Sequence, residues 1–394
     1  MRESRLDPRE VRETALRALA ALGRLPSAPY YEHRGAEYVR AFCERAGLEV
    51  HADRWGNILA SRPGSSPDAP GLALVAHLDH PGFEAVEEDG GNLVCHALGG
   101  IPPGALQRGV KVLILGSEQG EGGAGRAAAG TSAVRRISGE VIAAEPVSED
   151  AHDTPPSDRT VIVRPSQPVK DFPCAVVFDL PDFDLDHETI RMRALDDLAG
   201  CAAALAALKA AAAVQTPGAL YGLFTRAEET GLIGARLAAE DGLLPKNTVI
   251  VSVESSRALP GAEIGKGPVI RVGDARTTFD SRAEAYLAVA RERIAARAGT
   301  FPCQRQLMSG GTCEASAFAA HGYLATGLAF PLGNYHNAGP DNTVAAEYIS
   351  LADFAGGAVL LAEAAGLAGA YPVSASTSRF RARPEEEARR LTEG

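Results

Sequence analysis

The chain has 394 residues, of which 45% are hydrophobic and 23% are charged, and its net charge is −11. This composition is typical of a folded globular protein and excludes collagen, coiled-coil and disordered classes. A negative net charge repels polyanions, so we expect neither nucleic acid nor a membrane surface among the partners.

The N-terminal 26 residues are charged and amphipathic, and they lack the apolar stretch and cleavage site of a signal peptide. Helical spacing of apolar residues predicts helices over residues 7–22 and 38–46. No later run reaches the roughly 18 apolar residues of a membrane span. The six cysteines form no C-x-x-C pair, and a chain of this size needs no disulfide frame. We therefore expect a protein of the reducing cytoplasm.

Short continuous apolar runs predict strands that are buried on both faces. They cover residues 71–77, 220–225 and 248–253, with a weaker run at 324–330. Helical patterns alternate with them at residues 198–213, 234–240 and 282–296. This alternation predicts an α/β fold with a doubly wound, mixed but mostly parallel sheet flanked by helices.

Residues 84–188 have a different pattern, in which short β-like pieces are separated by Gly, Pro, Asp and Ser. We interpret them as an inserted β-rich domain, with a mobile loop at residues 116–130. The surrounding domain then consists of residues 1–83 and 189–375. Residues 376–394 are predicted to be a charged C-terminal tail.

Metal-binding side chains follow the predicted strands or precede the helix that starts at residue 198. They are His77 and Asp79, Asp196, Glu228 and Glu229, Glu254, and His336. Because the carboxyl ends of parallel strands meet at one edge of a sheet, we expect these side chains to converge. Imidazole and carboxylate ligands suit zinc or another divalent first-row ion. Two ions sharing a carboxylate can activate a water and polarise a carbonyl, with an unliganded carboxylate as base.

Each of these residues also has an ordinary explanation when it is taken alone. A single histidine more often lies in a core or on a surface, and adjacent acidic residues often cap helices. The coincidence at several strand ends makes the metal site the stronger interpretation. His80 and His96 are weaker candidates, and the histidines that follow no apolar run are assigned no role: His33, His51, His152, His187 and His321.

Seven short motifs occur in a fixed order along the chain. They are DRWGN at 53–57, AHLDHPGF at 76–83, RALDDLAG at 193–200, EETGLIGA at 228–235, IGKGP at 264–268, GGT at 310–312 and NYHN at 334–337. Together they resemble the tetrahedral or deblocking (glutamyl-type) aminopeptidases. This family belongs to the co-catalytic dizinc metallopeptidases, which are related to aminoacylase and the carboxypeptidase-like zinc exopeptidases.

The resemblance implies a zinc exopeptidase fold in which residues 84–188 form a barrel-like domain for oligomerisation or substrate access. It implies a homo-oligomer, from a dimer to a dodecamer, and two divalent metal ions per chain. Zinc is the expected metal, with cobalt or manganese as alternatives.

The resemblance also implies a role for each matching residue. The implied metal ligands are His77 and Glu254 on the outer sides, Asp196 as the bridge, and Glu229 and His336. Glu228 would be the general base, and Asp79 would orient His77 through a hydrogen bond. Thr312 and Cys313 would lie against the substrate.

Three residues depart from the family pattern. Glu254 replaces the common Asp, Leu198 replaces an Arg, and Cys313 replaces an Asp. The metal ligands are retained. The changes at Leu198 and Cys313 lie at positions that help to place the substrate and the neighbouring loops. We therefore predict a metal-dependent hydrolase of amide bonds, and the leading hypothesis is an aminopeptidase that acts on short peptides. One alternative is a deacylase or amidohydrolase acting on an N-acyl small molecule, and the other is an inactive binding protein on the same fold.

Overall fold

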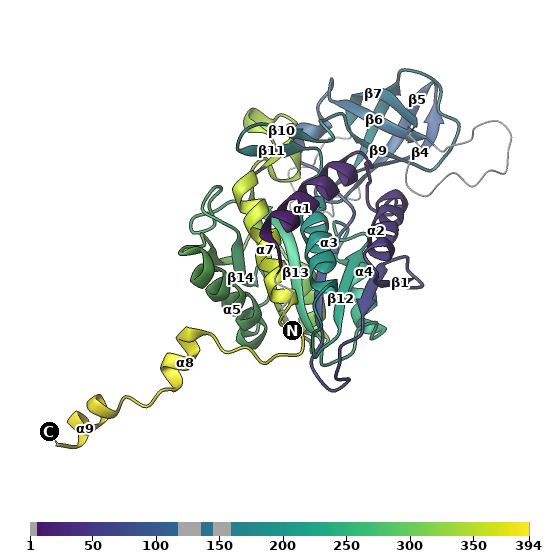
Figure 1. Cartoon of the computed structure of the whole chain (residues 1–394). Coiled ribbons are helices and arrows are strands. Elements are labelled where there is room, and N and C mark those ends of the chain that lie inside the picture. Colours follow the sequence, from purple (N-terminus) through teal and green to yellow (C-terminus); the bar gives the residue numbers. More distant parts are fainter. Residues whose placement is uncertain (1–5, 117–134, 145–158, 394) are drawn as a thin grey trace.

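The computed structural model describes residues 6–116, 135–144 and 159–393 (Figure 1). Its main sheet has the strand order β1-β2-β12-β3-β13-β16-β14-β15. The bounds are β1 (Glu49–Ala52), β2 (Ile58–Arg62), β3 (Leu72–His77), β12 (Leu220–Thr225), β13 (Val249–Arg257), β14 (Val269–Asp274), β15 (Gln304–Met308) and β16 (Leu324–Leu332). The central strands β12, β3, β13 and β16 run parallel, so their carboxyl ends share one edge.

These central strands are the four that the apolar runs predict. All six residues of β3 are buried, as expected for a strand covered on both faces. The antiparallel edge strands β1 and β2, and the pair β14 and β15, were not predicted. β1 is mostly exposed, β15 alternates half-buried residues with exposed ones, and neither carries a continuous apolar run.

Helices cover both faces of the main sheet. One face carries α1 (Pro8–Gly23), α2 (His33–Arg45), α3 (Leu198–Ala212), α5 (Ser281–Ala298) and α7 (Leu351–Ala365). The other face carries α4 (Ile233–Glu240) and α6 (Glu314–Ala320). The α/β prediction is confirmed, although α2 begins at His33 rather than at residue 38.

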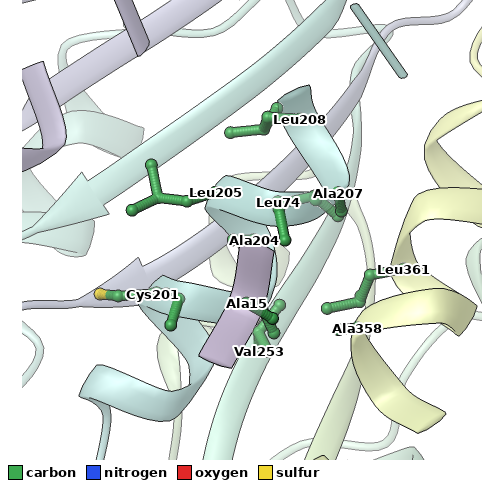
Figure 2. Close-up of a cluster of buried hydrophobic side chains, with 14 of the residues drawn as sticks. Ala15, Leu74, Cys201, Ala204, Leu205, Ala207, Leu208, Val253, Ala358 and Leu361 are labelled. Atoms are coloured by element: carbon green, nitrogen blue, oxygen red, sulfur yellow. The ribbon is translucent and has the colours of Figure 1, made fainter. Parts of the chain in front are cut away.

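Helix α3 is apolar on almost every side because it is enclosed by the sheet, α1 and α7. Figure 2 shows Cys201, Leu205 and Leu208 of α3 among side chains of the neighbouring elements, including Leu74 of β3 and Leu361 of α7. All five of these side chains have 0% exposure. Their packing fixes the start of α3 and therefore the position of the acidic pair before it.

The inserted segment forms a closed antiparallel barrel with the order β4-β5-β8-β7-β6-β9 (Figure 1). Its strands are β4 (Gly82–Asp89), β5 (Asn92–Leu98), β6 (Lys111–Gly116), β7 (Arg135–Ala144), β8 (Thr160–Pro165) and β9 (Cys174–Phe178). The barrel has its own hydrophobic core, which includes Phe83 and Phe178. The expected mobile loop at 116–130 lies, apart from Gly116, outside the described residues.

A small sheet of β10 (Asp184–Leu185), β11 (Thr189–Met192) and β17 (Glu347–Ser350) lies beside the main one. The short helices are η1 (Pro103–Leu106), η4 (Tyr335–Asn337) and η5 (Pro340–Asn342). The C-terminal helices α8 (Ala375–Arg381) and α9 (Glu385–Glu393) extend away from the body (Figure 1). Among the described helices, none has the length and apolar character needed to cross a membrane.

Candidate metal centre

The predicted ligands converge at the carboxyl edge of the parallel strands. His77 is the last residue of β3, Glu254 lies in β13, and Asp196 comes two residues before α3. Glu229 follows β12, and His336 lies in η4 after β16. All five residues are buried or nearly so, since none of their side chains exceeds 13% exposure.

Two groups of these side chains are compact enough to hold an ion each. His77, Asp196 and Glu254 form one group, and Asp196, Glu229 and His336 form the other, with ligand atoms within 4.8 Å of one another. His77 with Glu228 and Glu229 meets the same limit. The first two groups share Asp196, whose Oδ1 lies 3.4 Å from His77 Nε2 and whose Oδ2 lies 3.7 Å from His336 Nε2.

Several carboxylate oxygens in the centre lack a partner. Asp196 Oδ1 and Glu229 Oε1 are buried, and neither makes a hydrogen bond within the described part of the chain. Buried carboxylates without a partner are costly unless a cation compensates them. The mixed imidazole and carboxylate donors fit zinc or a similar divalent ion.

Both histidine rings are oriented by main-chain carbonyls. His77 Nδ1 donates to the carbonyl oxygen of Asp79 at 3.1 Å, and His336 Nδ1 donates to that of Gly100 at 3.1 Å. Because Nδ1 donates in each ring, the Nε2 lone pair faces the carboxylates and is free to bind a metal.

Asp79 was expected to orient His77 through a hydrogen bond, and the hydrogen bond between these residues uses the main-chain oxygen of Asp79. Its carboxylate Oδ1 lies 3.7 Å from His77 Nδ1. The two carboxylate oxygens instead accept hydrogen bonds from the backbone N–H groups of Glu228 and Glu229, each at 3.0 Å. Asp79 therefore links β3 to the acidic pair after β12.

The metal-free centre holds strongly shifted titratable groups. Burial raises the pKa of Glu228 well above its usual range; His77 opposes this shift, and Glu229 adds to it. Burial alone would lower the pKa of His77, but Glu228 and Asp196 raise it well above the ordinary value. Burial likewise opposes the shift of His336, whose pKa is raised to about 9, mainly by Glu229. These shifts are those of a cluster with excess negative charge.

A cavity of about 740 Å³ extends from the centre. Thr312 and Cys313 both line it, as expected for residues near a substrate. Cys313 is only 1% exposed, and its backbone N–H donates to Asp274 at 3.1 Å. The acidic lining residues all lie in the metal centre, whereas four arginines line the rest of the wall: Arg236, Arg257, Arg271 and Arg276.

Four residues of the site were not predicted from the sequence. Gly100 comes from the loop after β5, Arg271 from β14, Glu314 from the first turn of α6, and Glu347 from β17. Glu314 is fully buried and accepts hydrogen bonds from Thr225 at 2.9 Å and Ser252 at 3.0 Å. The apolar pattern around Arg271 and the GG pair at 99–100 were available signals, but neither indicates a site without the tertiary fold.

A family model for the M42 glutamyl aminopeptidases matches residues 56–341. The chain belongs to the M42 peptidase family. This confirms the resemblance noted from the motifs. M42 enzymes are metallopeptidases, so the chain is a metal-dependent aminopeptidase that works with divalent ions. The deacylase and inactive binding alternatives are not favoured.

Solved structures show the same fold. An aminopeptidase from Desulfurococcus kamchatkensis superposes with a TM-score of 0.71 at 23% identity, covering 90% of this chain and 94% of that one. Pyrococcus horikoshii TET1 peptidase superposes with a TM-score of 0.67 at 23% identity, covering 89% of this chain and 99% of that one. A TET aminopeptidase from a marine-sediment thaumarchaeon superposes with a TM-score of 0.70 at 18% identity, covering 94% of this chain and 99% of that one. Comparison with curated protein sequences found no match.

Proposed function

We propose that this M42 peptidase is a dinuclear aminopeptidase in which Asp196 is shared by two metal ions. His77 and Glu254 would hold one ion, and Glu229 and His336 the other. The observation that carries the proposal is the pair of ligand groups that meet at Asp196. The unpartnered oxygens of Asp196 and Glu229 support it. Zinc is the metal we propose, with cobalt and manganese as alternatives that the same donors accept.

A bound pair of divalent ions supplies a nucleophilic water at neutral pH and polarises the scissile carbonyl. Glu228 would accept the proton of that water on its carboxylate and deliver it to the leaving amine. Two features support this role. The Glu228 carboxylate lies 3.9 Å from His77 Nε2, beside the ligands, and Asp79 fixes its backbone N–H.

We propose peptides with an acidic N-terminal residue as the preferred substrates. Arg271 is 2% exposed, and it has no carboxylate within 4 Å among the described residues. Its guanidinium donates to Ser256 Oγ at 3.3 Å, and its Nε has no partner in the described structure. Glu254, Asp274 and Glu314 act on its charge from a distance, but none binds it directly. A buried guanidinium with no carboxylate at hydrogen-bond distance favours binding of one.

The distance along β13 supports this assignment. Ser256 is two residues beyond Glu254 on the same strand, so both side chains point to the same side, about 6–7 Å apart. When the carbonyl group of an N-terminal glutamate of the substrate lies at the metal centre, the side chain of that glutamate is long enough to cover these 6–7 Å and reach Arg271. The family name refers to the same specificity.

We propose that residues 84–188 are an oligomerisation and substrate-access domain inserted between residues 1–83 and 189–375, with residues 376–394 as a tail. The closed barrel within the insertion supports this division. Relatives assemble into a dodecamer, a tetrahedron or an octahedral shell, and we propose a homo-oligomer for this chain as well. Light scattering tests the assembly. The six cysteines are free, which supports a reducing cytoplasm.

The decisive experiment is Glu228→Gln in the zinc-loaded enzyme. We expect kcat to fall by about 10²–10⁴-fold because the base is lost, while two ions per chain remain bound. Glu240→Gln, at an exposed carboxylate of α4, is the matched control and should keep full activity. Near-normal activity of Glu228→Gln would refute the assigned base. A wild-type protein that binds no metal would refute the whole proposal.

A further inference from the structure

Glu347 joins two separate segments that each carry a proposed ligand. Its side chain is fully buried. Oε2 accepts hydrogen bonds from the backbone N–H groups of Leu195 at 2.7 Å and Asp196 at 3.0 Å. Oε1 accepts one from the N–H of His336 at 2.9 Å. One carboxylate therefore fixes the main chain at Asp196 and at His336 together.

His80 contacts the same two segments through its ring. Nδ1 lies 2.6 Å from the carbonyl oxygen of Asp196, and Nε2 lies 2.9 Å from Asn337 Oδ1, both within hydrogen-bond distance. The Asn337 amide is oriented because its Nδ2 donates to the carbonyl oxygens of Arg193 and Ala345, at 2.8 and 3.3 Å. With 1% exposure and both nitrogens engaged, His80 is a structural neighbour of the centre rather than a ligand.

The chain at His336 adopts an uncommon conformation that needs such support. His336 and Asn337 have φ angles of 54° and 61°, in the left-handed region that residues other than glycine rarely occupy. Glu347 holds the N–H of His336, and His80 holds the side chain of Asn337. Neither Glu347 nor His80 makes a hydrogen bond to His77 or Glu254 in the described structure.

We propose that Glu347 and His80 are positioning residues for the ion of the Asp196, Glu229 and His336 group. They act through the backbones of Asp196 and His336 and the side chain of Asn337, and they set the two ligands at the separation that this ion requires. The inference rests on the proposed dinuclear site. It assigns to this pair a larger effect on the ion that uses both held ligands, Asp196 and His336, than on the ion that uses only Asp196. A general contribution to stability would not produce that difference.

The test is a zinc titration of the metal-free protein by calorimetry, repeated with cobalt so that the absorption spectrum reports the ligand geometry. Glu347→Gln is the first variant because it keeps the side-chain volume but removes one acceptor oxygen. The matched control is Asp353→Asn. Asp353 is another buried carboxylate, and it accepts hydrogen bonds from the backbone N–H groups of Gly265 and Gly267, both at 2.7 Å. None of these three residues lines the cavity at the centre.

We expect the wild type and Asp353→Asn to bind two ions with the same affinities. Glu347→Gln should bind the ion of the Asp196, Glu229 and His336 group about 10–100-fold more weakly, weaken the other ion clearly less, and show an altered cobalt spectrum. His80→Gln, whose amide cannot span both partners as the ring does, should give the same pattern and decides the question if Glu347→Gln does not fold. Unchanged affinities, or an equal loss of both ions, would overturn the proposal. A wild type that binds two ions but cleaves no peptide would refute the aminopeptidase instead.

Discussion

Replacing Arg271 with methionine tests the proposed substrate preference most directly. The change keeps an unbranched side chain that reaches about as far as Nε, and it removes the buried guanidinium. No carboxylate among the described residues lies within 4 Å of Arg271, although Glu254, Asp274 and Glu314 act on its charge from farther away. Its one polar contact, with Ser256 at 3.3 Å, is to a hydroxyl that can turn to another partner.

The size of the effect follows from the burial of this group. Hydrogen bonds to charged groups contribute about 1.5–3 kcal/mol, which corresponds to about 10–150-fold in kcat/KM for a substrate whose carboxylate binds Arg271. A substrate with an N-terminal leucine has no carboxylate at that position. Its kcat/KM should therefore stay close to the wild-type value, and the preference for glutamate should fall by the whole factor.

The assay compares glutamyl and leucyl chromogenic amides on the zinc-loaded wild type and variant. Arg276→Met is the matched control because Arg276 lines the same cavity but is exposed. Solvent screens an exposed charge, so the control should change the preference by less than about fivefold. The reasoning is refuted if Arg271→Met lowers kcat/KM equally for both substrates, or if the glutamyl preference remains.

Three further predictions concern the metal centre and the core. In Gly100→Ala the new Cβ would lie 2.5 Å from His336 Nδ1, so the metal content measured by mass spectrometry should fall. Gly310→Ala is the control because Gly310 has open space around it, and this variant should keep both ions. Equal metal content in the two variants would contradict the prediction. The raised pKa of His336, about 9, means that its extra proton stabilises the metal-free protein fully below pH 6.5 and is lost as the pH rises through about 9. Calorimetric zinc affinity should therefore increase with pH over that range, with proton release, and a flat profile would refute the shift. Leu205 of α3 is fully buried (Figure 2), so Leu205→Ala should lower the free energy of unfolding by about 2–5 kcal/mol in a denaturant titration. A loss below about 1 kcal/mol would show that α3 is not tightly packed.

The sequence by itself determined the central strands and the chemistry at their ends. A parallel strand that is buried on both faces needs a continuous apolar run, and the run stops where the chain leaves the sheet. His77 and Glu254 could therefore be placed at a common edge from local pattern alone. The motif order added the family, which the match over residues 56–341 confirms. The roles of the individual ligands remain predictions.

Only the tertiary structure decided which residues support that edge. Gly100 reaches His336 from the barrel, and Glu347 reaches Asp196 from β17. Arg271 lies in the buried strand β14, and no carboxylate of the described residues lies within 4 Å of its guanidinium. None of these residues has a local signature, because a glycine, a glutamate or an arginine gains its role from groups far away in the sequence. The apolar pattern determines where each strand ends, whereas the packing of separate segments determines what meets there.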